Sequence, residues 1–211
     1  MSQRKVLALL TCNASLRDDY QGALRLGMER ACAALDVDLW VFAGRNNWIR
    51  SADQHRLFRL LDPSRVHGIV LAAGLVESFT PLEGVLATLR ERCNVPTCAV
   101  GQRVEGMPSI LIDNAAAAAT AAEHLIQVHG CRRFAYVSGP SEHYESRERL
   151  RGVSAALARH GLSLDEGNIV RGDFAVSGGH RAVAELLLRG QDFDALLAVN
   201  DHMALGAIEA L

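Results

Sequence analysis

Residues 112–140 read IDNAAAAATAAEHLIQVHGCRRFAYVSGP, and this stretch shows the unit from which the fold is built. Its alanines predict a helix over Ala115–Val128, because alanine is the strongest helix former. Asp113 or Asn114 precedes that helix and is suited to cap it, by accepting a hydrogen bond from one of the first free amides. A short apolar run, Phe134–Val137, then ends at the turn Ser138-Gly139-Pro140. The stretch therefore predicts a helix followed by a buried strand.

The same order of elements recurs along the rest of the chain. Other short apolar runs do not alternate with polar residues, which indicates strands buried on both faces of a parallel sheet. These runs are Val6–Leu10, Leu39–Phe42, Gly68–Ala72, Thr97–Val100, Ser109–Ile112 and Ala195–Val199. Between the first two, apolar residues such as Leu24, Met28 and Ala31 recur at helical spacing. This alternation predicts a doubly wound α/β fold.

The alternation is interrupted once, from Gly101 to Asn114, where the chain has two glycines, a proline and no helical period. We interpret this stretch as the crossover between two Rossmann-like lobes: 1–101 for the first, 102–114 for the crossover and 115–211 for the second. The last helical pattern starts at Asp201 and is still running at Leu211. So small a second lobe would leave a sheet edge uncovered, and we therefore expect it to be incomplete, truncated at the C-terminus.

Composition excludes several classes of protein. The 211 residues carry a formal net charge of −2, which does not favour electrostatic binding to nucleic acid. No apolar run approaches the roughly 20 residues that a membrane-spanning helix requires. The five cysteines are odd in number and scattered, a pattern that fits reduced thiols better than a disulfide framework. We expect a cytoplasmic protein that does not bind membranes.

Motifs for cofactors, metals and catalysis are missing from the sequence. The residues after the first run, TCNASLRDDY, contain no glycine-rich phosphate loop, and no Gly-Lys-Ser/Thr occurs anywhere. Cys93 and Cys98 lack a second pair to complete a zinc tetrahedron, and His124 and His129 are predicted to lie on different helix faces. A Gly-x-Ser-x-Gly nucleophile motif is also absent. We therefore predict no cofactor, no metal, no catalytic residues and no enzymatic activity.

Polar residues follow the predicted strands, and ligands of open α/β sheets bind at the carboxyl ends of the strands. They include Asn13, Ser15, 17–20, 46–48, Gln102, Arg103, 141–149, Asp173, Phe174, Asn200 and Asp201. Amide, carboxylate, guanidinium and aromatic groups that face one cleft suit a small polar molecule such as a sugar or purine. The alternative for each residue is a local role. Asp201 could cap the last helix, and Arg149 could pair with Glu145 on its own helix.

From Val6 to Leu211 the chain resembles the effector-binding domain of the LacI/GalR transcriptional regulators, which is itself similar to periplasmic sugar-binding proteins. The resemblance lies in VHGIVLAA at 66–73, the stretch 112–140, SRERLRGVSAAL at 146–157, GDFAVSGGHRA at 172–182 and VNDHMALGAIEAL at 199–211. The asparagine–aspartate pair followed by Met-Ala-Leu-Gly is the strongest single signature.

This resemblance implies roles for the candidate residues. Arg149 would reach the ligand with its guanidinium, and Phe174 would pack against a sugar or base face. Asn200 and Asp201 would be polar contacts of the second lobe, and Asp113 would lie near the hinge and pocket. The first lobe would contribute its loop Asn13–Tyr20, and Gln102 is a candidate only through its place after the fourth predicted strand. Many sugar-binding relatives have Asp-Arg where this chain has Gly101-Gln102, which argues against a simple pentose or hexose.

The resemblance also implies a function and partners. The chain would be the small-molecule sensor domain of a LacI-type regulator, with sugar- or nucleoside-like effectors and ligand-driven movement of its lobes controlling the output. Its partners would be the effector, a second copy in a homodimer, and DNA only through a helix-turn-helix domain absent from this chain. Apolar positions for a dimer, or for core packing, are Leu57, Leu60, Leu61, Leu82, Val85, Leu86 and Leu89. The alternative function is the N-terminal cytoplasmic sensor of a longer signalling protein, a kinase or nucleotide cyclase.

Overall fold

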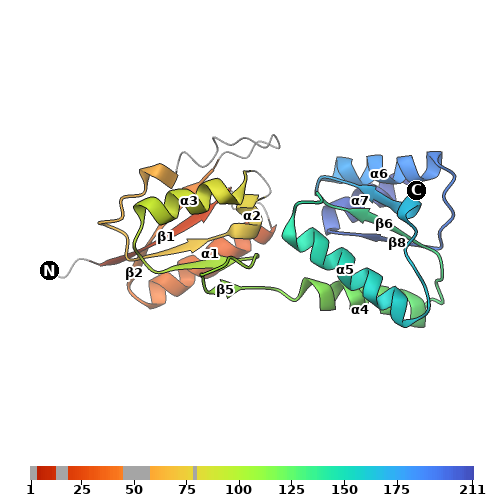
Figure 1. Cartoon of the computed structure of the whole chain (residues 1–211), viewed down its shortest axis with the longest axis horizontal. Coiled ribbons are helices and arrows are strands. Elements are labelled where there is room, and N and C mark those ends of the chain that lie inside the picture. The colour runs from red at the N-terminus through yellow and green to blue at the C-terminus, as the bar shows by residue number, and fades with distance from the viewer. Residues whose placement is uncertain (1–3, 13–18, 45–57, 78–79) are drawn as a thin grey trace. The chain divides into compact units, whose positions relative to one another are not determined.

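The computed structural model describes residues 4–12, 19–44, 58–77 and 80–211, and Figure 1 draws its elements. The chain consists of two compact units, Met1–Ile112 and Asp113–Leu211. The division between them lies within the stretch interpreted as a crossover. Each unit is built around its own parallel sheet and its own core.

The first unit contains a five-stranded parallel sheet in the order β2-β1-β3-β4-β5. Its strands are β1 (Lys5–Thr11), β2 (Val37–Ala43), β3 (Gly68–Leu71), β4 (Thr97–Val100) and β5 (Ser109–Ile110). Its helices are α1 (Asp19–Ala34), α2 (Ala73–Glu77) and α3 (Leu82–Arg92). Val85 and Leu89 of α3 pack in the core with Ala8 and Ile69, while α1 lies over the opposite face of the sheet. Helices on both faces explain why the strands are apolar throughout.

The second unit contains a three-stranded parallel sheet in the order β7-β6-β8. The strands are β6 (Phe134–Ser138), β7 (Ile169–Arg171) and β8 (Ala195–Ala198), and a short 3₁₀ turn, η2 (Glu166–Asn168), precedes β7. The helices are α4 (Asn114–Gln127), α5 (Tyr144–Arg159), α6 (Val176–Leu188) and α7 (Asp201–Ala210). Figure 1 shows α4 beside α5 and α6 beside α7, with the sheet between the two pairs.

Glycines allow the paired helices of the second unit to approach closely. A Cβ on Gly152 of α5 would overlap the carbonyl group of Ala115 and lie 2.8 Å from its Cα in α4. A Cβ on Gly206 of α7 would likewise lie 2.8 Å from the backbone nitrogen of His180 in α6. Both helix pairs therefore pack backbone against backbone at these positions.

The predicted α/β fold with parallel sheets is confirmed. Every strand predicted from an apolar run coincides with an observed strand, although the ends differ by a residue or two. One strand, β7, was not predicted. Its three residues include only one that is buried, Val170, so they form no apolar run that the sequence could reveal.

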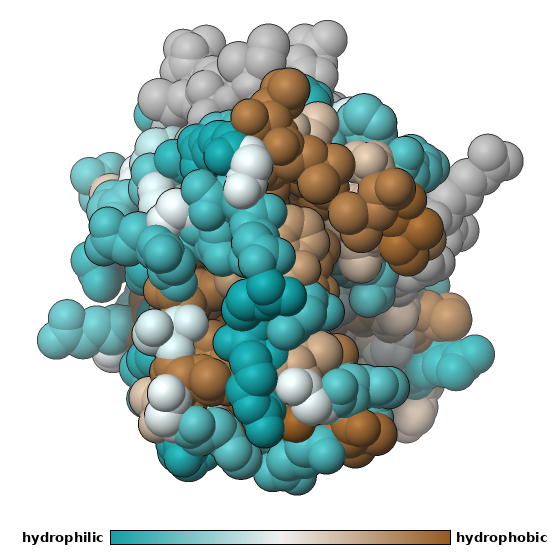
Figure 2. All heavy atoms as spheres, turned by 90° about the vertical axis from the view of Figure 1, so that its right-hand side faces the viewer, coloured by the Kyte–Doolittle hydropathy of each residue, from teal (hydrophilic) through white to brown (hydrophobic). Residues whose placement is uncertain are grey.

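Most of the apolar positions considered for a dimer belong instead to the first core. Leu61, Leu82, Val85 and Leu89 are buried there, and Leu86 packs against them, while Leu60 is 72% exposed. Leu57 lies outside the described residues. Other exposed apolar side chains lie on or next to α6 and α7: Leu187, Leu188, Leu205, Ile208 and Leu211. Figure 2, which faces the right-hand side of Figure 1, shows exposed hydrophobic residues among hydrophilic ones.

Candidate functional site

The carboxyl ends of β6, β7 and β8 meet at one edge of the second sheet, because the three strands are parallel. Three helices begin there: α5 follows β6, α6 follows β7 and α7 follows β8. The loops between them bring together residues 139–143, 172–175 and 199–200. We call this edge, together with the first turns of α4, α5 and α7, the carboxyl edge.

Arg149 is fixed at the carboxyl edge by three contacts. Its Nε donates a hydrogen bond to Oδ1 of Asn114 at 2.7 Å, and its Nη1 donates to the carbonyl oxygen of Val199, also at 2.7 Å. Its Nη2 lies 3.6 Å from Oε2 of Glu145, one turn earlier on α5. Arg149 therefore pairs with Glu145, and it also reaches the carbonyl group of Val199 beyond the end of β8. Its contact with a ligand stays a prediction.

The guanidinium group retains donors for a ligand. Arginine carries five N–H bonds in a planar fork, and these contacts engage Nε and one side of each terminal nitrogen. One N–H on Nη1 and one on Nη2 have no partner among the described residues, and the side chain is 27% exposed. A pair of donors held in a fixed plane suits neighbouring hydroxyl groups or the edge of a base.

Asn200 and Asp201 have different roles at the start of α7. Oδ1 of Asn200 caps the helix by accepting from the amide of Met203 at 3.0 Å, and its Nδ2 donates to the carbonyl oxygen of Phe174 at 3.0 Å. Asn200 therefore joins two of the loops. The suggestion that Asp201 caps this helix is wrong, because Asn200 occupies that position. Asp201 is the exposed first residue of α7.

Phe174 lies at the carboxyl edge in a left-handed backbone conformation, with φ of 69°. The carboxylate of Asp173 accepts from the amide of Ala175 at 3.0 Å and so closes the turn around it. The ring covers Gly139, where a Cβ would lie 2.6 Å from Cζ of Phe174. It also packs edge-on against the His143 ring, with 4.8 Å between the ring centres. His143 is buried, and it belongs to the stretch 141–149 that was expected to follow a strand end.

Asp113 is the residue that caps α4, by accepting from the amide of Ala116 at 2.9 Å. Its neighbour Asn114, rather than Asp113 itself, binds Arg149. Asn114 is buried, and sequence reasoning considered it only as a cap. No local pattern could have revealed its contact with Arg149, because the two residues are 35 positions apart.

The candidates of the first unit are not brought together among the residues described. Gln102 follows β4, where its Nε2 donates to Oε1 of Glu77 at 3.2 Å. Tyr20 lies on α1 and is 42% exposed. The remaining candidates of the first unit lie outside the described residues: Asn13, 15, 17, 18 and 46–48.

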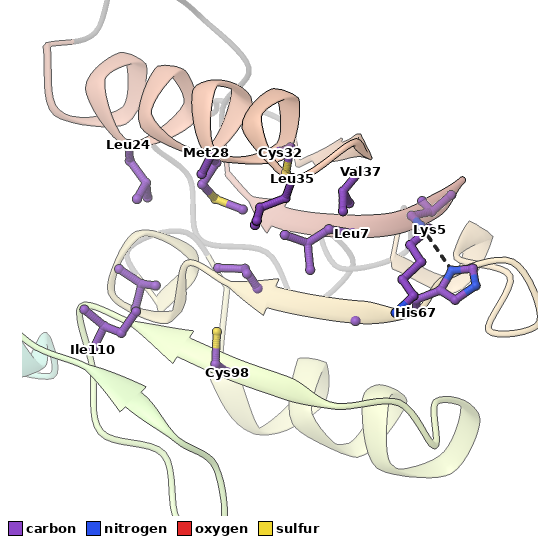
Figure 3. A pocket seen from close by; sticks show the side chains of 15 residues that line it. Lys5, Leu7, Leu24, Met28, Cys32, Leu35, Val37, His67, Cys98 and Ile110 are labelled. Carbon is purple, nitrogen blue, oxygen red and sulfur yellow. Dashed lines mark hydrogen bonds between the residues drawn. The ribbon is translucent and has the colours of Figure 1, made fainter. Parts of the chain in front are cut away.

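The first unit also contains an apolar cavity of about 450 Å³ between α1 and the sheet. Figure 3 shows Leu24 and Met28 of α1 pointing toward Leu7, Cys98 and Ile110 of the strands. Its few polar groups include His67, whose Nδ1 accepts a hydrogen bond from the amide of Val6 at 3.1 Å. So few polar groups do not suit a sugar, so the carboxyl edge of the second unit is the better candidate site.

Among the described residues, no three His, Cys, Asp or Glu side chains group to hold a metal ion. His124 and His129 are nevertheless close, with 3.2 Å between their Nε2 atoms. The prediction that they lie on different faces is wrong because α4 ends at Gln127, before His129. Within the described segments, no helix is both long and apolar enough to cross a membrane.

Comparison with known proteins identifies the family. The family of periplasmic binding proteins and sugar binding domains of LacI type matches residues 4–211. The chain belongs to this family. Among LacI-family relatives, it is 34% identical to the transcriptional regulator CelR of Thermobifida fusca over 168 residues, which is 77% of this chain and 47% of CelR. It is 28% identical to the ribose operon repressor of Escherichia coli over 215 residues, 100% of this chain and 61% of the repressor.

Solved structures of LacI-type regulators have the same fold. The CelR–cellobiose complex matches with a TM-score of 0.78 and 29% identity, over 99% of this chain and 63% of that one. A sugar-binding regulator of the LacI family from Escherichia coli, complexed with phosphate, matches with a TM-score of 0.77 and 27% identity, over 98% and 72%. The chain spans less than two thirds of the length of the curated relatives named here.

Proposed function

We propose that this chain is the effector-sensing part of a LacI-type transcriptional regulator and binds a sugar- or nucleoside-like molecule at the carboxyl edge of its second unit. The observation that carries the proposal is the fixed guanidinium of Arg149, which has donors left for a ligand after binding Asn114 and Val199. Phe174 offers an apolar ring at the same edge, and Asp201 offers a carboxylate. Relatives named for ribose and cellobiose support a carbohydrate-like effector.

The proposed output is a movement of the two lobes that follows effector binding and changes the DNA affinity of the regulator. We further propose that the protein is cytoplasmic, acts without catalysis and works as a homodimer. Sedimentation of the protein at micromolar concentration tests the dimer, and a strictly monomeric full-length protein would count against it.

Arg149→Ala tests the site. Wild-type protein is first screened by thermal shift against neutral mono- and disaccharides, ribose and cellobiose among them, and against nucleosides. Calorimetry with the best ligand should then show a ten- to hundredfold loss of affinity in the variant, because a hydrogen bond to a charged donor contributes about 1.5–3 kcal/mol.

Arg151→Ala is the matched control, since Arg151 lies on the same helix and pairs with Glu148 at 2.6 Å. It should bind the ligand like the wild type. Equal affinities of the wild type and Arg149→Ala would contradict the assignment of the site.

A further inference from the structure

Carboxylates outnumber arginines at the carboxyl edge. In residues 113–114, 139–149, 171–175 and 199–202 there are six acidic residues and three arginines. Arg171 pairs with Glu142 at 3.0 Å, and Arg147 donates to the carbonyl oxygen of Glu142 at 2.6 Å. Arg181, on α6 beside this edge, pairs with Asp173 at 2.6 Å. The edge therefore offers little unbalanced positive charge.

Arg149 itself has a carboxylate beside it. Oε2 of Glu145 lies 3.6 Å from Nη2, and the Glu145 side chain is only 13% exposed. Water screens such a partly buried charge less than a charge at the surface, so Glu145 acts strongly on whatever approaches the guanidinium. An anion on the free N–H groups of Arg149 would meet the negative charge of Glu145 at close range. A hydroxyl group would accept from the same N–H groups without that repulsion.

We propose that Glu145 makes the Arg149 site selective for uncharged effectors, so that it binds hydroxyl or amide groups and rejects phosphate and carboxylate groups. This inference rests on the proposed function, because it deepens the description of the same site. Glu145 would be a specificity-determining residue: it need not touch the ligand, and it acts through the charge that it places next to Arg149.

Inorganic phosphate is the probe that tests this selectivity. Calorimetric titrations at constant ionic strength compare the wild type with Glu145→Gln, which keeps the size of the side chain and its ability to accept from Arg149 but removes the charge. The wild type should show no saturable binding up to tens of millimolar phosphate. Glu145→Gln should gain saturable binding at least tenfold tighter, and Arg149→Ala added to it should abolish the gain.

Glu148→Gln is the matched control, because Glu148 lies on the same helix and pairs with Arg151 instead. It should behave like the wild type. Saturable binding of phosphate by the wild type with an affinity similar to that of Glu145→Gln would overturn the inference, as would the absence of any gain in the folded variant. The wild-type titration tests the inference even if Glu145→Gln does not fold.

The same measurements separate this inference from the function on which it rests. If no neutral sugar or nucleoside binds, the proposed function fails, whatever the phosphate titrations show. If a neutral ligand binds through Arg149 and the wild type also binds phosphate, the function stands and the selectivity fails.

Discussion

Tyr136 places a polar group in the core of the second unit. Its side chain is 2% exposed, and its hydroxyl group has no hydrogen-bond partner among the described residues. A buried hydroxyl group without a partner costs about 1–3 kcal/mol, because it has lost its bonds to water. Tyr136→Phe removes that group and leaves the ring in place, so we expect the free energy of unfolding in urea at pH 8 to rise by about 1 kcal/mol. A lower stability of the variant would show that the hydroxyl group has a favourable contact.

Because Tyr136 is buried, we also expect the free energy of unfolding to depend on pH in the alkaline range. Burial raises the pKa of Tyr136 to about 12, and the nearby positive charge of Arg149 opposes this rise only in part. The unfolded chain ionises its tyrosines near pH 10, so the protonated phenol favours the folded state fully below pH 10. This contribution is lost as the pH rises through 12, by about 3 kcal/mol in all. The difference between the free energies of unfolding of Tyr136→Phe and the wild type, measured in urea, should therefore grow between pH 10 and 12. A difference that stays constant over this range would contradict the raised pKa of Tyr136.

At the scale of elements, the contact of α4 with α5 depends on the absence of a side chain at Gly152. A Cβ there would overlap the carbonyl group of Ala115, and backbone atoms cannot move aside as side chains do. We expect Gly152→Ala to lower the free energy of unfolding by about 3 kcal/mol, at the upper end of the cost of overpacking.

Gly27→Ala is the control for Gly152→Ala. Gly27 is an exposed residue of α1, and nothing lies within 4 Å of a Cβ placed on it. Both changes replace a helical glycine with alanine, so the gain in helix propensity is the same. Gly27→Ala should raise the stability by 0.5–1 kcal/mol, roughly. Similar changes in the two variants would show that α4 and α5 are not in close contact.

Helices and strands could be predicted from the sequence where a local pattern of apolar residues marks them. Strands such as β4 follow from continuous apolar runs, whereas β7 was missed because only Val170 is buried. The amphipathic pattern of α3 predicted an apolar face but not what covers it, and the sheet of its own unit covers most of it. Likewise, the helical spacing indicated Glu145 as a partner for Arg149. It could not predict Asn114 and the Val199 carbonyl as partners, because those contacts depend on the packing of separate elements.

At the scale of the whole molecule, the proposed effector has two candidate sites. The carboxyl edge of the second unit offers fixed polar groups, and the cavity under α1 in the first unit offers an almost entirely apolar lining. Hydroxylated ligands lose hydrogen bonds to water when they bind, so they require a site that replaces those bonds. The carboxyl edge meets that requirement, and the cavity does not.

Hydrogen exchange of the chain, measured with and without the tightest-binding sugar or nucleoside of the screen, tests this assignment most directly. We predict slower amide exchange on binding in residues 141–149, 172–175 and 199–203, which include Arg149, Phe174 and Asn200. Unchanged exchange in all three segments, with slower exchange confined to residues 24–35 around the cavity under α1, would contradict it.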